Sequence, residues 1–429
     1  MALLGVSSLN RHESENLPSP LFAKEGNDSS LTKRSFPPFL LLLLLFLLIF
    51  INPGYSQPSL KVGALVPFTG RWGEAGRECA KGLVDGGKWI NQRGGVFGRK
   101  LEILLLEDTT QPAETVAAYR KLNEADHIFL LYIYSTETAL TLLPYIQLYR
   151  IPTLVSFLPS DMANPSKGPF LFTISPTILD TAKIAMHFVS EKSGIKLRKP
   201  KLVFVGIQSH FDRHFLEEAK QYARGLGIDV GPDVRVPDFS LSGESSPGSK
   251  STPTLTSALS AMTSYEPDFA YLSLTSRESF SVLQEAKKMG LKTRWVGNRK
   301  AFDETLSPFE NVFGVQPIAP YGEDIPGMAG IREAHQKWHP FDSHTLSYVE
   351  GWATSQVIAE AMGRSLPEQR LSRERVKGSL ESFRDFVSGG LLPPITITPN
   401  DHRPSVESRI FTIKEGKISR YTSFISLGR

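Results

Sequence analysis

Small hydroxyl side chains gather where apolar runs of this sequence end and helical patterns begin. In chain order they are Thr69, Ser135, Thr136, Thr138, Ser156 and Ser160. Hydroxyls donate hydrogen bonds to anions without adding bulk, and the first N–H groups of a helix are unpaired and carry partial positive charge. Each hydroxyl could instead only cap its own helix. Several such positions in one half of the chain nevertheless favour a shared cleft that binds a carboxylate.

The elements that would position these hydroxyls alternate along the chain. Runs with strand character lie at 61–66, 101–106, 127–133, 153–157, 202–206, 269–274 and 294–297. Helical patterns lie at 77–93, 112–124, 137–148, 179–191, 213–226, 255–264 and 276–289. Continuous apolar runs are typical of parallel strands covered on both faces, and this order predicts right-handed βαβ units. Their number predicts two α/β lobes rather than one sheet. Ligands of such sheets bind beyond the carboxyl ends of the strands.

The last third of the chain changes character. It is first mainly helical, at 328–339, 347–366 and 372–383, and then rich in β-forming residues. We expect a strand at 394–398 and a hairpin of 409–414 with 417–421 around a Glu-Gly turn. The Ser/Gly/Pro-rich segment 238–253 is predicted to be a surface loop.

The composition excludes several classes of protein. The 429 residues carry a formal net charge of +4. The sequence has no cluster of basic residues, so it does not indicate a nucleic-acid partner. The single cysteine, Cys79, excludes an intramolecular disulfide and a cysteine-based metal cluster. Phosphate-binding-loop, nucleophile-elbow and His-Glu-x-x-His motifs are absent. His210 and His214 lack an apparent third ligand, so we expect no metal, no cofactor and no enzymatic activity.

An apolar run near the N-terminus indicates export. Phe39–Ile51 has 13 residues without a polar side chain and follows two basic residues. A signal-peptide core needs ~7–15 apolar residues, whereas a membrane-spanning helix needs ~20. Gly54 and Ser56 then precede an expected cleavage site. We therefore predict a leader and signal peptide at 1–56 and a periplasmic or extracytoplasmic protein, with an uncleaved N-terminal anchor as the alternative.

Longer motifs accompany these features. They are Val62–Gly70 (VGALVPFTG), Ile90–Glu102 (INQRGGVFGRKLE), Leu106–Thr109, Ser135–Thr138, Ile151–Pro152 and Lys287–Leu291. With them, the chain from about Leu60 to Thr422 resembles the branched-chain amino-acid (leucine/isoleucine/valine) type of periplasmic solute-binding proteins of ABC transporters.

The resemblance implies an α/β fold of two doubly wound lobes that close on a ligand by a hinge. Three hinge crossovers would join the lobes, near 175–177, 315–320 and 391–394. Lobe 1 would comprise 57–175 plus 318–392, and lobe 2 would comprise 176–317 plus 393–429.

The resemblance also implies which residues bind the ligand. The matching positions are Trp72, Ser135, Thr136, Thr138, Ser156, Ser160, Phe211, Thr275, Ser276 and Arg299. First-lobe hydroxyls would hold a ligand carboxylate, Phe211 would cover the ligand, and Thr275 and Ser276 would lie in a second-lobe contact region. Trp72 would stack on the ligand or serve packing alone.

Arg299 differs from the residue that amino-acid binders have at this position, which is an acidic partner for the ligand ammonium. A guanidinium cannot pair with an ammonium. Arg299 therefore favours an organic acid over the family's default amino acid, unless Glu278 or Asp212 takes the ammonium.

The function expected from these features is that of a non-enzymatic substrate-binding protein of an ABC importer. It would bind a small carboxylate-bearing solute in the cleft between the lobes. Its partners would be that solute, a membrane permease and the permease's ATPase, without nucleic acid, and the protein would be a monomer. The alternative is a ligand-sensing receptor domain of the same fold.

Overall fold

The computed structural model describes residues 58–428, apart from 193, 196, 208–209, 238–253 and 367–369. For residues 192 and 210–214 it describes the backbone without the side chains. The predicted leader at 1–56 and the predicted loop at 238–253 therefore lie outside the described residues.

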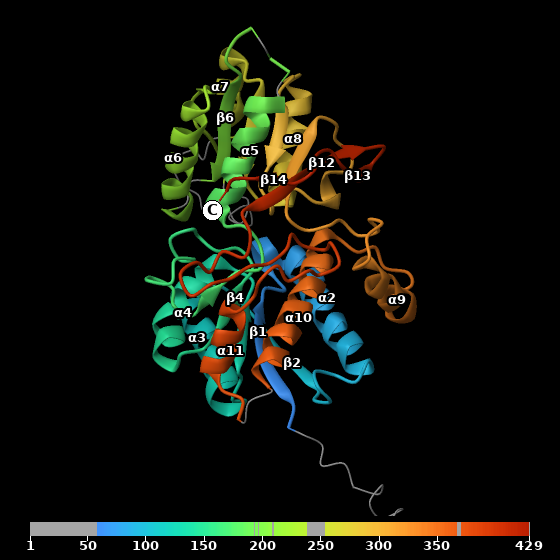
Figure 1. The fold of residues 1–429 in the computed structure, drawn as a ribbon. Coiled ribbons are helices and arrows are strands. Elements are labelled where there is room, and N and C mark those ends of the chain that lie inside the picture. The colour runs from blue at the N-terminus through green and yellow to red at the C-terminus, as the bar shows by residue number, and fades with distance from the viewer. Residues whose placement is uncertain are drawn as a thin grey trace, which may run out of the picture. The chain divides into compact units, whose positions relative to one another are not determined.

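The first lobe is built on a five-stranded sheet whose strand pairs are all parallel, in the order β2-β1-β3-β4-β5. The strands are β1 (Leu60–Val66), β2 (Leu101–Glu107), β3 (Leu130–Ile133), β4 (Thr153–Val155) and β5 (Leu171–Phe172). The strands predicted at 61–66, 101–106, 127–133 and 153–157 are confirmed, with ends that differ by a few residues. The lower half of Figure 1 shows this sheet with its helices.

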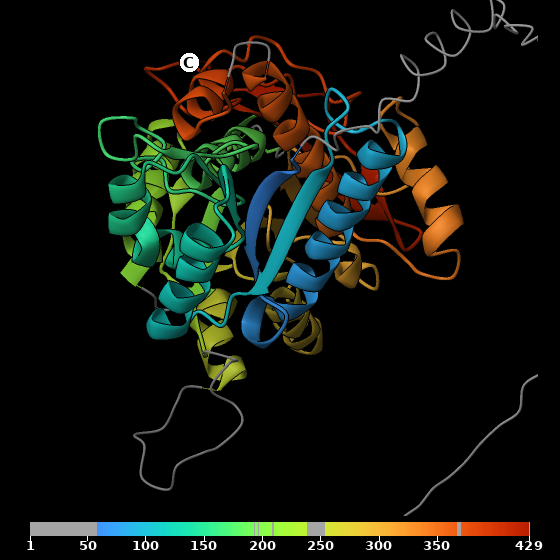
Figure 2. The same ribbon diagram turned by 90° about the horizontal axis from the view of Figure 1, so that it is seen from below.

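Helices cover both faces of the first sheet, which explains why its strands are mainly apolar. The helices of this lobe are α2 (Gly73–Gln92), α3 (Pro112–Arg120), α4 (Thr136–Tyr149), α9 (Met328–Trp338), α10 (Leu346–Ser365) and α11 (Arg373–Glu381), with a π-helical turn, η2, at Lys121–Ala125. Alternate residues of a strand point to opposite faces. Val62 and Ala64 join the core with α2 and α10, whereas Leu65 joins the core with α3 and α4. Figure 2 shows α2 on one side of β1 and β2, and the teal helices on the other.

The second lobe contains a nine-stranded sheet. Its main path is β13-β12-β11-β10-β9-β6-β7, and β8 and β14 pair with β6 and β12. The strands are β6 (Lys201–Ile207), β7 (Asp229–Val230), β8 (Val234–Val236), β9 (Phe269–Ser273), β10 (Arg294–Gly297), β11 (Val312–Gln316), β12 (Glu407–Lys414), β13 (Lys417–Arg420) and β14 (Ile425–Ser426). Its helices are α5 (Ile178–Lys192), α6 (His210–Gly225), α7 (Leu255–Tyr265) and α8 (Ser276–Lys288). The predicted fold of two α/β lobes and the predicted C-terminal hairpin are both confirmed.

The strand predictions need correction at 394–398 and at β11, and they also missed the short strands β5, β7, β8 and β14. Residues 394–398 form isolated bridges instead of a strand, because the backbone of Ile395 and Ile397 bonds to Phe386 and Phe383 rather than to a sheet. The sequence prediction placed no strand at β11, where Gly314 weakens the strand signal. The ring of Phe302 lies 2.1 Å from the place of a Cβ on Gly314, so the glycine admits this close contact.

Three segments connect the lobes. The first two lie between β5 and α5 and between β11 and α9. The third lies later in the chain than the expected 391–394. His402, which lies beyond this expected crossover, stacks on Phe172 of β5 with ring centroids 4.0 Å apart. Its Nδ1 lies 2.8 Å from the carbonyl oxygen of Leu171. By these contacts His402 belongs to the first lobe, although the sequence placed 393–429 in lobe 2.

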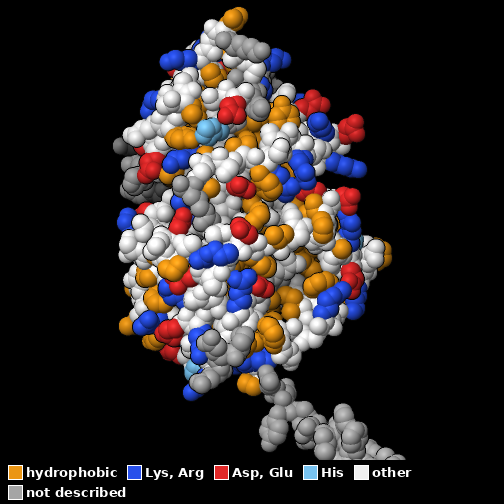
Figure 3. All heavy atoms as spheres, viewed as in Figure 1, with side chains coloured by type: hydrophobic (Ala, Val, Ile, Leu, Met, Phe, Trp, Pro, Cys, Tyr) orange, Lys and Arg blue, Asp and Glu red, His pale blue; other side chains and the backbone are white. Residues whose placement is uncertain are grey.

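The surface gives two further findings. Basic and acidic side chains of the described residues are interspersed on the face shown in Figure 3. Within residues 58–428, leaving aside those not described, no helix combines the length and the apolar character needed to cross a bilayer. The apolar run at 39–51 lies outside this search.

Candidate functional site

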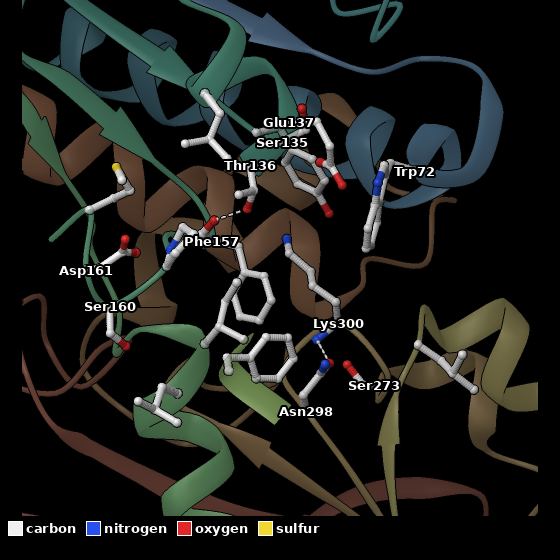
Figure 4. A pocket seen from close by; sticks show the side chains of 18 of the residues that line it. Trp72, Ser135, Thr136, Glu137, Phe157, Ser160, Asp161, Ser273, Asn298 and Lys300 are labelled. Atoms are coloured by element: carbon white, nitrogen blue, oxygen red, sulfur yellow. Dashed lines mark hydrogen bonds between the residues drawn. The ribbon is translucent and has the colours of Figure 1, made fainter. Parts of the chain in front are cut away.

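A cavity of about 360 Å³ lies at the carboxyl ends of strands from both sheets. In each sheet the strand order reverses there, between β1 and β3 and between β6 and β9, which is where open α/β sheets bind ligands. Its walls are mainly apolar, with Trp72, Tyr134 and Phe157 from the first lobe and Leu179 and Phe215 from the second. Figure 4 shows Trp72 on one side of this space and Ser160 and Asp161 on the other.

The N-terminus of α4 faces the cavity. Ser135 is its N-cap and accepts a hydrogen bond from the N–H of Thr138 at 3.1 Å. The Ser135 and Thr138 hydroxyls both donate to the buried carboxylate of Asp108, at 3.0 and 2.6 Å. Ser135, Thr136 and Glu137 line the cavity, whereas Thr138 does not line it. The structure therefore uses these two hydroxyls to orient the helix, whose first N–H groups have no partner within the helix.

Two other predicted hydroxyl residues line the cavity and also have partners in the protein. Thr136 donates to the carbonyl oxygen of Phe157, which follows β4 (Figure 4). The hydroxyls of Ser160 and Thr177 lie 2.6 Å apart. The segment after β4 is thereby held against both α4 and the first connection between the lobes.

Ser156 and Arg299 belong to a buried charge cluster that joins the lobes. Arg299 Nη1 lies 2.8 Å from Glu350 Oε1, and Lys300 Nζ lies 3.1 Å from Glu350 Oε2. Arg299 Nη2 donates to the carbonyl oxygen of Ser156, Lys300 Nζ donates to the Ser156 hydroxyl at 3.1 Å, and that hydroxyl donates to Glu350. Arg299 and Lys300 follow β10 of the second lobe, whereas Ser156 and Glu350 belong to the first.

Lys300 is the member of this cluster that lines the cavity. Its ammonium lies 3.8 Å from the ring centroid of Tyr134, a favourable cation–π contact. Burial lowers the pKa of Lys300 to about 8, with Arg299 acting in the same direction and Glu350 against it. Burial alone would raise the pKa of Glu350, but Arg299 and Lys300 outweigh this effect and hold it at about 2.

Sequence reasoning missed Lys300 and Glu350. Lys300 follows Arg299, the residue that was predicted to bind the ligand. Only the turn after β10 determines which of these two side chains faces the cavity. Glu350 offered one signal, because it is an acidic residue on the buried side of the apolar helix α10.

The second-lobe hydroxyls lie in a separate chamber of about 490 Å³, next to the cavity. Thr275 and Ser276 line it together with Arg299, and Arg71, Trp72 and Lys300 line both spaces. Thr275 is the N-cap of α8 and forms a capping box with Glu278.

Glu278 is already occupied by a first-lobe cation. Arg71 donates to both of its carboxylate oxygens, at 2.7 and 2.9 Å. The alternative partners for a ligand ammonium were Glu278 and Asp212. Arg71 neutralises the first, and the side chains of Asp212 and Phe211 lie outside the described residues.

No catalytic or metal centre emerges from the described residues. Among them, no group of three or more His, Cys, Asp and Glu side chains is arranged to hold a metal ion. Burial raises the pKa of the Cys79 thiol to about 12, so this thiol stays protonated and is a poor nucleophile.

Comparisons with known proteins identify the family. The sequence pattern of the periplasmic binding protein family matches residues 59–417, and the chain therefore belongs to that family. The chain is 22% identical over 329 residues to the Leu/Ile/Val-binding protein homolog 7 of Brucella suis biovar 1 (strain 1330), covering 72% of this chain and 78% of that protein.

Solved structures share the fold. A branched-chain amino acid ABC transporter protein from Thermus thermophilus, with bound valine, superposes with a TM-score of 0.76 and 20% identity, covering 86% of this chain and 97% of that one. A solute-binding protein of an ABC transporter from Rhodopseudomonas palustris BisB5, in complex with 3,4-dihydroxybenzoic acid, has a TM-score of 0.69 and 16% identity, with coverages of 86% and 98%. Family membership makes this chain an extracytoplasmic solute-binding protein and not an enzyme.

Proposed function

We propose that this protein is the substrate-binding component of an ABC importer for a small organic acid with an apolar, preferably aromatic, body. One observation carries the proposal: the ammonium of Lys300, on a side chain only 6% exposed, lies at the wall of a mainly apolar cavity. A carboxylate can form a charge-assisted hydrogen bond with this ammonium. The rings of Trp72, Tyr134 and Phe157 offer flat apolar contacts to the rest of the ligand.

The charges around the cavity disfavour an α-amino acid. A ligand ammonium would need a desolvated carboxylate, but Glu350 is paired with Arg299 and Lys300, and Glu278 is paired with Arg71. Glu137, Asp161 and Glu218 also line the cavity. Asp161 and Glu218 are exposed and screened by water, and Glu137, in the first turn of α4, is half-buried rather than fully desolvated. The similar structure with 3,4-dihydroxybenzoic acid shows that this fold can hold an aromatic acid, whereas the one with valine shows the amino-acid alternative.

The family and the hinged fold support the proposed importer role. Residues of both lobes line the cavity, so a bound acid would stabilise the closed arrangement over the open one by its differential affinity. A permease that recognises the closed arrangement would then receive the loaded protein, and an ATPase would drive transport. We also propose that 1–56 is a cleaved leader and that the protein acts as a monomer.

A ligand panel tests the proposal. Thermal unfolding followed by fluorescence, and then calorimetric titration, would compare benzoate, hydroxybenzoates and short aliphatic acids with valine, leucine and phenylalanine. A ligand at 100 times its Kd stabilises the folded state by about 2.7 kcal/mol, so an acid that binds should raise the Tm by several degrees. Tighter binding of any amino acid than of every acid without an ammonium would refute the organic-acid assignment. No binding across the panel would refute the function.

Replacing Asp108 should weaken binding of the preferred acid, although Asp108 does not line the cavity. In the Asp108→Asn variant, an amide nitrogen replaces one of the two oxygens that accept from Ser135 and Thr138. We expect about tenfold weaker binding and a loss of about 1–2 kcal/mol in unfolding free energy, measured by calorimetry and urea denaturation. The matched control is Asp324→Asn, because Asp324 is fully exposed and should change neither value. Unchanged affinity in Asp108→Asn would show that the orientation of α4 does not matter for binding.

A further inference from the structure

The buried cluster between the lobes has an unbalanced charge. The side chains of Arg299, Lys300 and Glu350 are 1%, 6% and 3% exposed. Two cations therefore share a single carboxylate in a region that water hardly reaches, and the three residues together carry a net charge of +1 when Lys300 is protonated.

Neighbouring groups do not supply the missing negative charge. Both oxygens of Glu350 are already in ion pairs, one with each cation. Ser156 contributes only a neutral hydroxyl and a carbonyl oxygen. Cys79 and Tyr134, which also face the cluster, stay protonated because burial raises the pKa of each. The Arg71–Glu278 pair nearby is neutral overall.

The imbalance is directed at the cavity through Lys300. Arg299 turns its guanidinium toward Glu350 and Ser156 and lines the adjoining chamber with Glu350, so Lys300 is the cation of the cluster that lines this cavity. Lys300 reaches into the space between Trp72 and Phe157 in Figure 4. An excess of buried positive charge is costly even when each cation has a partner, so a negative group placed beside Lys300 would relieve that cost.

We propose that the ligand supplies the second carboxylate of this cluster, so that the protein selects acids with one negative charge and no ammonium. Lys300 is then the specificity-determining residue, and Glu350 is a positioning residue that holds Lys300 toward the acid. The proposal rests on the solute-binding function proposed above and adds the charge that the solute must carry. A neutral isostere would leave the imbalance in place, and a zwitterion would bring a third cation into the cluster.

The same arrangement couples recognition of the ligand's charge to closure of the two lobes. Arg299 and Lys300 come from the second lobe, and Glu350 and Ser156 come from the first. An acid beside Lys300 therefore stabilises a contact across the hinge, and a neutral analogue of equal shape does so less. The sign of the ligand charge thus contributes to closure as well as to affinity.

The experiment compares benzoate with benzamide, its neutral isostere, on the full chain at pH 7. Calorimetric titration of the wild type should give at least about 30-fold tighter binding of benzoate. Lys300→Met should weaken benzoate binding roughly 100-fold and change benzamide binding less than threefold. Lys288→Met is the matched control, because Lys288 is exposed at the end of α8, and it should leave both affinities unchanged.

The positioning role of Glu350 has its own readout in a pH profile. Without Glu350, Arg299 would push Lys300 toward its neutral form, so Glu350→Gln should bind benzoate about tenfold more weakly at pH 8. The deficit should shrink at pH 6, where Lys300 regains its proton, and Glu350→Asp should restore part of the affinity. A deficit that is equal at both pH values would mean that Glu350 acts only through the fold.

Failure of this inference can be told apart from failure of the proposed function. Equal binding of benzoate and benzamide by the wild type overturns the charge argument without needing any variant, so a misfolded Lys300→Met cannot hide the answer. The proposed acid-binding function fails only if no acid of the ligand panel binds.

Discussion

Replacing Gly351 with alanine should lower the unfolding free energy by about 3 kcal/mol. Helices α2 and α10 pack together closely at this position. A Cβ on Gly351 would lie 1.9 Å from the carbonyl oxygen of Cys79, and one on Gly82 would lie 1.9 Å from that of Tyr348. Both obstacles are backbone, so a helix must shift to admit a methyl group, and overpacking of this kind costs ~1–3 kcal/mol or more.

The matched control is the same substitution in an exposed helix. Gly378 lies in α11, and nothing stands within 4 Å of its missing Cβ. Gly378→Ala should raise stability by about 0.5–1 kcal/mol, because alanine loses less backbone entropy in a helix. Chemical denaturation of both variants gives the comparison. Stabilisation by Gly351→Ala would show that α2 and α10 can separate without loss.

The affinity for the preferred acid should fall as the pH rises above about 8. Burial lowers the pKa of Lys300 to about 8, and a carboxylate beside the ammonium would raise it in the complex. The favourable interaction is therefore fully present below pH 8. It is lost at about tenfold per pH unit above that value, until the pKa of the complex is reached.

Glu350, Cys79 and Tyr134 do not titrate between pH 7 and 10. The pKa of Glu350 is held at about 2, and those of Cys79 and Tyr134 are raised by burial, Cys79 to about 12. Burial raises the pKa of Glu304, four residues further along the chain than Lys300, to about 8, but Glu304 does not line the cavity. Calorimetric titration at intervals of half a pH unit measures the profile. Lys300→Arg is the control, because a guanidinium stays charged throughout this range and should flatten the curve. A flat curve for the wild type would remove Lys300 from contact with the acid.

Much of the fold could be predicted because burial on two faces leaves a local signal. β3 is apolar over its whole length and β1 is apolar apart from Lys61, since helices cover both faces of their sheet. The C-terminal hairpin could be predicted from the Glu-Gly turn between its two strands. By contrast, β11 was missed, since the glycine that lets Phe302 pack closely also makes the segment a poor strand by composition.

The candidate site was predictable only up to the elements that carry it. Strand ends and helix N-termini located Ser135, Thr136 and Ser160 near one cavity. The sequence could not show that Asp108 engages the hydroxyls of Ser135 and Thr138. It also could not show that Arg299 pairs with Glu350, because the two residues lie on different lobes and no periodicity links them.

The sequence by itself determined the class of fold, the alternation of strands and helices and the edge of each sheet at which the cavity lies. These features depend on local patterns of burial and capping, which a short window of residues contains. Only the tertiary structure decided which polar groups are already paired and which face the cavity. The charge balance of Arg299, Lys300 and Glu350 depends on contacts between the lobes, and it is this balance that points to an organic acid.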